Sequence, residues 1–338
     1  MTKKAYARAG VDVDLGNFLK RRIQARVKST HGPEVLGKIG GFGGLFAPNF
    51  SGMREPVLVA SVDGVGTKLK LAFALDRHDT VGADLVNHCV NDIAVLGARP
   101  LFFLDYIGAE RLEPRVFDQL LSGFSKACRL AGCALIGGET AQLPDMYHKG
   151  EYDLAGCIVG VVDRSKMIDG RRIKPGDVIL GLPSNGLHTK GYSLARKILF
   201  EKMRLKPSAK IDGINHSLGT ELLRVHRNYQ PSIARLPAGL IRGLAHITGG
   251  GLIDNLPRVL PENCDAAIET KSWRVPRIFQ VLQQNGKVDQ TEMYQVFNMG
   301  IGMVAIVSSK DAVTAARHLK ARRIGQIVRG TGKTKLIF

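Results

Sequence analysis

The spacing of hydrophobic and polar residues changes repeatedly along this chain between the period of strands and the period of helices. Short runs of apolar and β-branched residues predict strands at 57–62, 101–107, 134–136, 156–162, 178–182, 266–268 and 302–307. Helical spacing predicts helices at 82–96, 114–131, 193–203, 275–285 and 310–321. Because strands and helices mix without strict alternation, the pattern favours an α+β fold over a doubly wound parallel sheet.

The length of the chain, 338 residues, exceeds what a single hydrophobic core usually supports. Between two of the predicted strands, the segment 163–177 is polar and rich in turn-forming residues. Domain boundaries tend to fall in such segments. We therefore expect two domains of similar length, covering residues 1–168 and 169–338.

Composition excludes several classes of protein. Hydrophobic residues make up 44% of the chain and charged residues 23%, which is ordinary for a globular domain and unlike a disordered chain. The apolar runs are too short to span a bilayer, and the first residues lack the apolar core of a secretory signal. The five cysteines contain no CxxC pair, which argues against zinc sites and disulfide frameworks. We therefore expect a cytoplasmic protein with no membrane partner.

The net charge of +18 would ordinarily suggest a nucleic-acid partner. The basic residues concentrate near the ends, however: residues 1–30 hold eight Lys and Arg against two Asp, and residues 310–338 hold eight against one. Aromatic residues are not interleaved with them, as a base-stacking surface requires. We therefore expect no nucleic-acid partner, although the positive field would attract small anions.

Candidate chemistry begins in the segment SVDGVGTK (61–68), which leaves the first predicted strand. Asp63 stands at the strand end and is followed by Gly64, Gly66, Thr67 and Lys68. A carboxylate suits Mg²⁺, glycines let backbone N–H groups approach a phosphate, and a lysine supplies positive charge. The segment therefore fits a metal–phosphate site, and it fits a tight turn with a solvated lysine equally well.

The predicted helix at 82–96 carries a polar stripe on an otherwise apolar surface. At ~100° per residue the stripe spans roughly 140°, and its members are Asp84, Asn87, His88, Asn91 and Asp92. A helix this apolar is buried, so the stripe must face a cleft or polar partners. Two carboxylates with amides suit a hard cation. The alternative is an N-terminal acid followed by buried, hydrogen-bonded amides.

A third segment, ALIGGETAQ (134–142), places Gly137, Gly138, Glu139 and Thr140 directly after a predicted strand. For Glu139 this position suits a metal ligand or a nucleotide contact, and a helix-capping acid is the alternative. No complete P-loop accompanies these segments, because the first glycine that GTGKT (330–334) would need is Ile327.

The segment LPSNGLHTKGYSLAR (182–196) predicts a polar loop between a strand and a helix. Its polar side chains converge where a helix N-terminus would attract a phosphorylated substrate, and they are Asn185, His188, Thr189, Lys190 and Ser193. A single histidine in such a loop is as often structural as functional.

In the segment AHITGGG (245–251), three consecutive glycines open a short helical run. The backbone N–H groups of Gly249, Gly250 and Gly251 would form an anion cradle beside Thr248, and His246 could contact the same ligand. A structural turn is the alternative, but it seldom needs three glycines in series.

Taken in chain order, the motifs resemble those of the phosphoribosylformylglycinamidine cyclo-ligases, or aminoimidazole ribonucleotide (AIR) synthetases, within the AIR synthetase-related superfamily. The resemblance covers essentially the whole chain and rests on AGVDVDLGN (9–17), GGFGGLF (40–46), SVDGVGTK (61–68), DIAVLGARP (92–100), GGETAQLPDMY (137–147), LPSNGLHTKGYSLAR (182–196), HITGGGLIDNLPRVLP (246–261) and FNMGIGM (297–303). Two departures are Met299, where the family often has Cys, and Asp145, where Gly is common.

The resemblance implies a two-domain AIR synthetase-like fold and a homodimer. The strands of an N-terminal domain that binds ATP and Mg²⁺ would pair with those of a second subunit, and a C-terminal α+β domain would lie on the substrate side. Among the site residues, the resemblance implies catalytic roles for Asp63, Lys68, Asp92 and His188.

Ligand contacts follow from the same resemblance. Those implied for ATP are Gly64, Gly66, Thr67, Lys68, Asp92, Gly137, Gly138, Glu139 and Thr140. Those implied for the metal are Asp63, Asp84, Asn91 and Asp92. Those implied for a small phosphorylated ribonucleotide substrate are Asn185, His188, Ser193, His246, Thr248, Gly249, Gly250 and Gly251.

The implied activity is the ATP-dependent ring closure of formylglycinamidine ribonucleotide to aminoimidazole ribonucleotide, with release of ADP and phosphate, in de novo purine biosynthesis. The formyl oxygen would first receive the γ-phosphoryl group, and a nitrogen of the same molecule would then attack. The alternatives are a sister phosphorylating enzyme of the same superfamily and a non-catalytic, basic binding paralogue.

Overall fold

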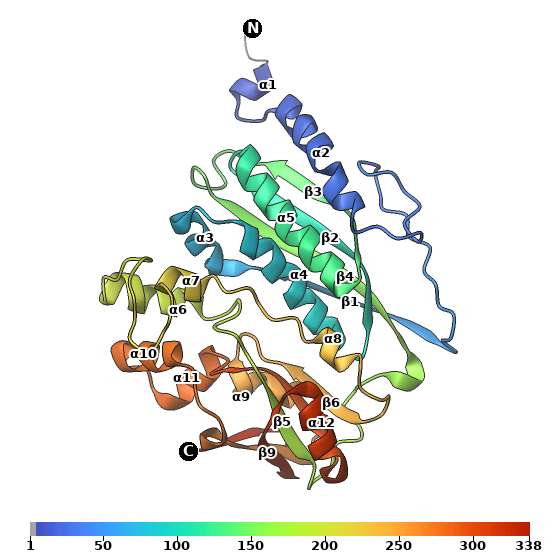
Figure 1. The fold of residues 1–338 in the computed structure, drawn as a ribbon, viewed down its shortest axis with the longest axis vertical. Helices are drawn as coiled ribbons and strands as arrows, with labels where there is room; N and C mark the ends of the chain where they lie inside the picture. Colours follow the sequence, from blue (N-terminus) through green and yellow to red (C-terminus); the bar gives the residue numbers. More distant parts are fainter. Residues whose placement is uncertain (1–4) are drawn as a thin grey trace. The chain divides into compact units, whose positions relative to one another are not determined.

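The computed structural model describes residues 5–338, which divide into two compact units (Figure 1). The first unit consists of the chain up to Ile93 together with Arg99–Val161, and the second consists of Ala94–Ala98 together with Val162–Phe338. Each unit contains one sheet with helices packed on it, so the predicted two-domain α+β fold is confirmed. The boundary expected between residues 168 and 169 stays a prediction.

The first unit is built on a four-stranded sheet in the order β1-β4-β2-β3. Its strands are β1 (Pro56–Gly64), β2 (Arg99–Ala109), β3 (Ala134–Gln142) and β4 (Tyr152–Asp163). Strand β2 runs parallel to β3 and antiparallel to β4. A parallel pair needs a crossover connection, which helix α5 (Pro114–Ala131) provides.

The longest helices of this unit are α2 (Val13–Lys28), α4 (Asp79–Ala94) and α5. Figure 1 shows α4 and α5 side by side on one face of the sheet. The two helices approach closely because glycines meet at their crossing. A Cβ on Gly82 of α4 would lie 2.5 Å from the Leu120 carbonyl oxygen of α5, and a Cβ on Gly123 of α5 would meet α4 equally closely. The crossing holds α4, which carries much of the candidate site, in a fixed position.

Helix α5 has the ends that its sequence predicted. The Glu113 carboxylate caps the first turn by accepting a hydrogen bond from the Val116 N–H at 3.0 Å. Pro114 follows at the first helical position, where no N–H is needed. The helix ends at Gly132, which adopts a left-handed φ of 68°.

The second unit is built on a six-stranded sheet in the order β10-β7-β9-β5-β8-β6. Its strands are β5 (Val178–Pro183), β6 (Ile241–His246), β7 (Cys264–Glu269), β8 (Ile301–Val307), β9 (Arg322–Arg329) and β10 (Thr334–Ile337). Strand β8 is buried along its whole length and pairs antiparallel with both β5 and β6. The core of this unit therefore forms around β8.

Short helices surround this sheet. They are α6 (Tyr192–Arg196), continued by a π-helical segment at Lys197–Lys202, then α7 (Leu218–Leu222), α8 (Gln230–Ile233), α9 (Gly251–Asn255), α10 (Arg277–Gly286), α11 (Gln290–Val296) and α12 (Ala312–Leu319). Helix α12 packs through Ala315 and Leu319 into the same apolar cluster as Leu180 of β5 and Met303 of β8.

Each strand and helix predicted from the sequence occurs in the structure, with ends that differ by a few residues. Strand β9 was not predicted, because its sequence RRIGQIVR interrupts the apolar residues with exposed arginines and a glutamine, and only Ile324, Gly325 and Ile327 are buried. Other elements were not predicted either, among them strand β10 and helices α2 and α11. Within residues 5–338, no helix combines the length and apolar character that crossing a membrane requires.

Candidate functional site

The SVDGVGTK segment forms the turn between β1 and helix α3 (Leu69–Leu75). Asp63 lies near the end of β1, and its Oδ1 accepts a hydrogen bond from the Gly64 N–H at 2.6 Å. A short 3₁₀ turn, Gly66–Lys68, follows. Gly66 has a φ of +71°, and a Cβ added there would meet no atom within 4 Å. Open space beside the backbone is what a phosphate contact would need, although contacts from Gly64, Gly66 and Thr67 stay predictions.

Lys68 is not the solvated lysine of a simple turn. Its side chain is 0% exposed, and its Nζ lies 2.8 Å and 2.9 Å from the two carboxylate oxygens of Asp84, which is also 0% exposed. Burial lowers the pKa of the Lys68 amine, while the Asp84 carboxylate favours its charged form. This pair ties the turn to α4. It stays a prediction that Lys68 contacts a phosphate and that Asp84 binds a metal ion. Either contact would require the Lys68–Asp84 ion pair to separate.

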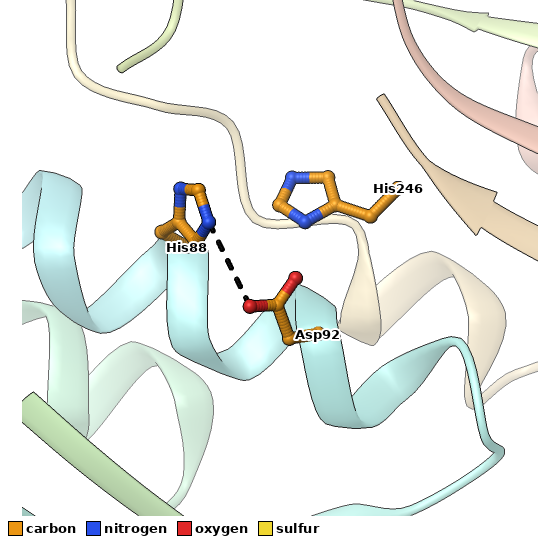
Figure 2. A group of neighbouring side chains, drawn as sticks. All are labelled: His88, Asp92 and His246. Carbon is orange, nitrogen blue, oxygen red and sulfur yellow. Dashed lines mark ion pairs between the residues drawn. The ribbon is translucent and has the colours of Figure 1, made fainter. Parts of the chain in front are cut away.

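His88 and Asp92 lie one turn apart on α4 and point the same way (Figure 2). The His88 Nε2 atom lies 2.6 Å from Oδ2 of Asp63 and 3.6 Å from Oδ2 of Asp92. The imidazole is 1% exposed, whereas both carboxylates are 26% exposed. Ser61 donates a hydrogen bond to the same Asp92 oxygen at 3.2 Å. The structure thus brings together the two acids that the sequence singled out, around a buried imidazole.

Sequence reasoning placed His88 on the polar stripe but did not include it among the site residues. The signal was present in the spacing of His88 and Asp92, four residues apart on a helix, which puts both side chains on one face. Elsewhere on the stripe, Asp84 and Asn91 are fully buried, as the apolar surroundings of the helix predicted. Metal coordination by Asn91 stays a prediction.

The residues 137–140 lie within β3, which continues to Gln142. The expectation that Glu139 follows the end of a strand is therefore wrong, and no helix begins there for it to cap. A Cβ on Gly138 would lie 2.2 Å from the Asp105 carbonyl oxygen of β2, so this glycine is needed for the close approach of two strands. Glu139 is exposed, and nucleotide contacts from Gly137, Gly138, Glu139 and Thr140 stay predictions.

Asp105, opposite Gly138 in the β2–β3 pair, was not singled out by the sequence. Burial raises the pKa of its carboxyl group to about 7. The environment therefore favours a neutral acid near the centre of the sheet. No pattern marks this position, because LFFLDY (101–106) has the composition of an ordinary strand.

In the second unit, the loop after β5 holds His188 in an uncommon conformation. His188 is buried and has a φ of +63°, in the left-handed region that non-glycine residues seldom adopt. Its Nε2 lies 2.9 Å from Oδ1 of Asn185, and the Asn185 amide donates to the Val225 carbonyl at 2.7 Å. Such backbone strain is common at functional sites. Ser193 is exposed on α6, and its substrate contact stays a prediction.

Three buried histidines lie in a row in this unit. The rings of His188 and His226 stack with their centroids 4.0 Å apart, and His226 Nε2 lies 2.9 Å from His246 Nε2 at the end of β6. One imidazole must donate and the other accept in that contact. The structure therefore joins two predicted substrate residues, His188 and His246, through His226. The sequence offered no signal for His226, which is far along the chain from both.

The three glycines after β6 lie in a closely packed part of the structure. Gly251 begins α9 with a φ of +57°, and a Cβ there would lie 1.9 Å from the Tyr294 carbonyl oxygen. Asn255 donates to the carbonyls of Gly249 and Gly251 at 3.0 Å and 2.8 Å. At least Gly251 is thus required for close packing, and anion binding by Thr248 to Gly251 stays a prediction.

Comparison with known proteins identifies relatives for the whole chain. Residues 53–162 match the family described as AIR synthase related protein, N-terminal domain, and residues 174–336 match its C-terminal domain. A phosphoribosylformylglycinamidine cyclo-ligase of Syntrophotalea carbinolica is 52% identical over 311 residues, covering 92% of this chain and 89% of that protein. One of Alkaliphilus oremlandii is 48% identical over 334 residues, covering 97% and 98%. The resemblance found in the sequence motifs is confirmed.

Solved structures share the fold at low sequence identity. Thiamine-monophosphate kinase from Stenotrophomonas maltophilia superposes with a TM-score of 0.68 at 20% identity and covers 94% of each chain. Hydrogenase maturation protein HypE in complex with ATP gives a TM-score of 0.67 at 18% identity, covering 94% of this chain and 90% of that one. These two structures establish the architecture only.

Proposed function

Because this chain belongs to the AIR synthase related family, we propose that it closes the imidazole ring of aminoimidazole ribonucleotide from formylglycinamidine ribonucleotide, using ATP and releasing ADP and phosphate. This is a C–N bond-forming ligation in de novo purine biosynthesis. The observation that carries the proposal is the name shared by relatives about half identical over nearly the whole chain. Matches to both domains of the family support it.

The chemistry explains why ATP is needed. The substrate's formyl group is part of an amide, so its carbon is a poor electrophile and its oxygen a poor leaving group. The formyl oxygen attacks the γ-phosphorus and ADP leaves. The amidine nitrogen of the same molecule then attacks the activated carbon, phosphate leaves with the former formyl oxygen, and loss of a proton gives the aromatic ring. Both reacting groups belong to one molecule, which favours the second step.

Asp63 and Asp92 fit the magnesium ion that would accompany the nucleotide. Their carboxylates are partly exposed, and each lies within 3.6 Å of one His88 nitrogen, so both acids face the same region, and carboxylate oxygens are the ligands that Mg²⁺ prefers. When bound, the ion neutralises charge on the phosphates. The turn at Gly64 to Thr67 would supply backbone N–H groups to the same phosphates.

In the second unit, Asn185 and His188 would contact the substrate together with His246 and the Thr248 to Gly251 loop. His188 is held by Asn185, so its ring orientation is defined before a ligand arrives. It would donate a hydrogen bond to the formyl oxygen or accept the proton lost on ring closure. Exposed Ser193 would contact the substrate phosphate.

We expect two copies of the chain to associate through the first unit. Strand β1 lies at the edge of the four-stranded sheet and exposes Leu58 and Val62 by 62% and 69%. An edge strand with exposed apolar side chains is a site for strand pairing. Light scattering at micromolar concentration measures this association, and Leu58→Lys should weaken it.

The proposal is tested by mixing the protein with ATP, Mg²⁺ and formylglycinamidine ribonucleotide. We expect one ADP and one phosphate for each aminoimidazole formed. ADP released without aminoimidazole, or only with another phosphate acceptor, would instead identify a sister phosphorylating enzyme. Neither product in the presence of folded protein would refute the proposed activity.

A further inference from the structure

His226 lies between two histidines that the family resemblance implies for substrate binding, although neither the sequence motifs nor the proposed function gives it a role. The residue is 1% exposed, and His188 and His246 are 3% and 6% exposed. A buried polar ring is stable only where its nitrogen atoms have hydrogen-bond partners. The contacts of His226 therefore decide what this row of three imidazoles can do.

The contact between His226 and His246 links the protonation of the two rings. Their Nε2 atoms lie 2.9 Å apart. Two N–H groups cannot face each other at this distance, and neither can two lone pairs, so one nitrogen donates and the other accepts. The form of one ring thus determines whether Nε2 of the other ring carries a proton.

His226 also fixes the plane of the His188 ring. The two rings stack with their centroids 4.0 Å apart and an angle of 22° between their planes. At the edge of the His188 ring, Nε2 lies 2.9 Å from Oδ1 of Asn185. The His188 imidazole is therefore held both at one face and at one edge.

The segment that carries His226 is anchored to the end of β5. Arg227 and Tyr229 both donate hydrogen bonds to the Pro183 carbonyl, at 2.9 Å and 3.0 Å. The Thr189 hydroxyl lies 3.4 Å from Nδ1 of His226, and a hydroxyl can donate or accept. Because the backbone beside it is fixed, His226 can hold its two neighbouring rings in one arrangement.

We propose that His226 is a positioning residue for ring closure. Its hydrogen bond fixes which His246 nitrogen carries a proton, and its stacked face fixes the plane of the His188 ring. The inference rests on the proposed function for the substrate roles of His188 and His246. What it adds is a third histidine that acts through the other two.

Two replacements of His226 separate the effect of its hydrogen bond from that of its ring. His226→Phe keeps a flat ring that can stack on His188 but has no nitrogen atom for His246. His226→Gln lacks the ring, but its amide reaches about as far as Nε2 and can donate or accept a hydrogen bond. Circular dichroism shows whether each variant folds.

The matched control is His78→Phe in the first unit. His78 is 3% exposed and, like His226, is a buried histidine with an aromatic ring beside it. Its Nδ1 lies 2.8 Å from the Tyr152 hydroxyl, and its Nε2 lies 3.3 Å from an Asp76 oxygen. Neither partner is a residue proposed for the site, so His78→Phe should form aminoimidazole at the wild-type rate.

Steady-state kinetics with formylglycinamidine ribonucleotide and ATP measure kcat and KM. Because a reacting group misplaced by about 1 Å can cost about 100-fold in rate, we expect His226→Phe to lower kcat by about 10-fold or more and to change each KM by less than about 3-fold. His226→Gln restores a partner for His246, so its kcat should be at least about 3-fold higher than that of His226→Phe. Equal losses in the two variants, no loss in His226→Phe, or a similar loss in His78→Phe would each overturn the inference.

Nitrogen NMR of isotopically labelled histidines tests the hydrogen bond in the wild type, whether or not the variants fold. Chemical shifts distinguish a protonated ring nitrogen from an unprotonated one. We expect a proton on Nε2 of either His226 or His246 but not on both, and two protonated or two unprotonated Nε2 atoms would overturn the inference. This measurement needs no activity, so a wild type that forms no aminoimidazole refutes the proposed function separately.

Discussion

The buried ion pair between Lys68 and Asp84 allows a quantitative test of what this lysine does. Both side chains are 0% exposed and the Nζ atom lies 2.8 Å from the nearer carboxylate oxygen. Lys68→Met removes the cation, keeps the aliphatic chain and leaves a buried carboxylate without its salt-bridge partner. Removing one member of a buried pair costs about 3–5 kcal/mol. We therefore expect Lys68→Met to lower the free energy of unfolding by that amount.

The double variant Lys68→Met/Asp84→Asn separates loss of the pair from creation of an isolated charge. Because the double variant has no buried carboxylate, it should recover at least half of the free energy of unfolding that Lys68→Met loses. Guanidinium unfolding followed by circular dichroism measures the change. The single tryptophan, Trp273, lies in the second unit, so its fluorescence shows whether that unit is affected too. A loss below about 1 kcal/mol in Lys68→Met, with additive effects in the double variant, would refute a structural pair and favour direct phosphate contact.

Three further predictions follow from particular residues. Asp92→Asn should lower ADP formation with Mg²⁺ by about 100-fold or more while the circular dichroism spectrum is unchanged; wild-type turnover would remove Asp92 from the site. Burial raises the pKa of Asp105 to about 7, well above the ordinary value of an aspartate, so the folded protein holds a proton that the unfolded chain loses. Stability therefore falls as pH rises from about 4 to 7. Asp105 is only partly buried as a whole residue, so solvent reduces the size of this effect. In urea unfolding we expect Asp105→Asn to raise the free energy of unfolding by about 2 kcal/mol at pH 8 and to change it little at pH 4. An equal change at both pH values would contradict this. Gly251→Ala brings a Cβ to 1.9 Å from the Tyr294 carbonyl oxygen, so it should lower the free energy of unfolding, measured by thermal unfolding, by about 2 kcal/mol or more. The control is Gly16→Ala in helix α2, where a Cβ meets no atom within 4 Å, and this variant should be as stable as the wild type or more stable.

The sequence by itself determined the elements whose patterns are strong and local. Helix α5 was placed at 114–131 from its apolar spacing, and its capping acid, its proline and its terminal glycine, which all act within a few positions, fix the same ends. The α+β class followed from the mixture of spacings, and the family followed from the order of the motifs. Asp63 and Asp92 could be singled out because each belongs to a motif with a recognisable chemical purpose.

Only the tertiary structure decided which of these residues meet. His88 is recognised as a site residue once β1 brings Asp63 to 2.6 Å from a helix that starts sixteen positions later. His226 joins His188 to His246 across long stretches of chain, and Lys68 is buried because Asp84 lies beside it. Periodicity reports which face of an element is buried, but not which element covers that face. The partners of a polar side chain depend on long-range packing, and no local pattern in the chain encodes them.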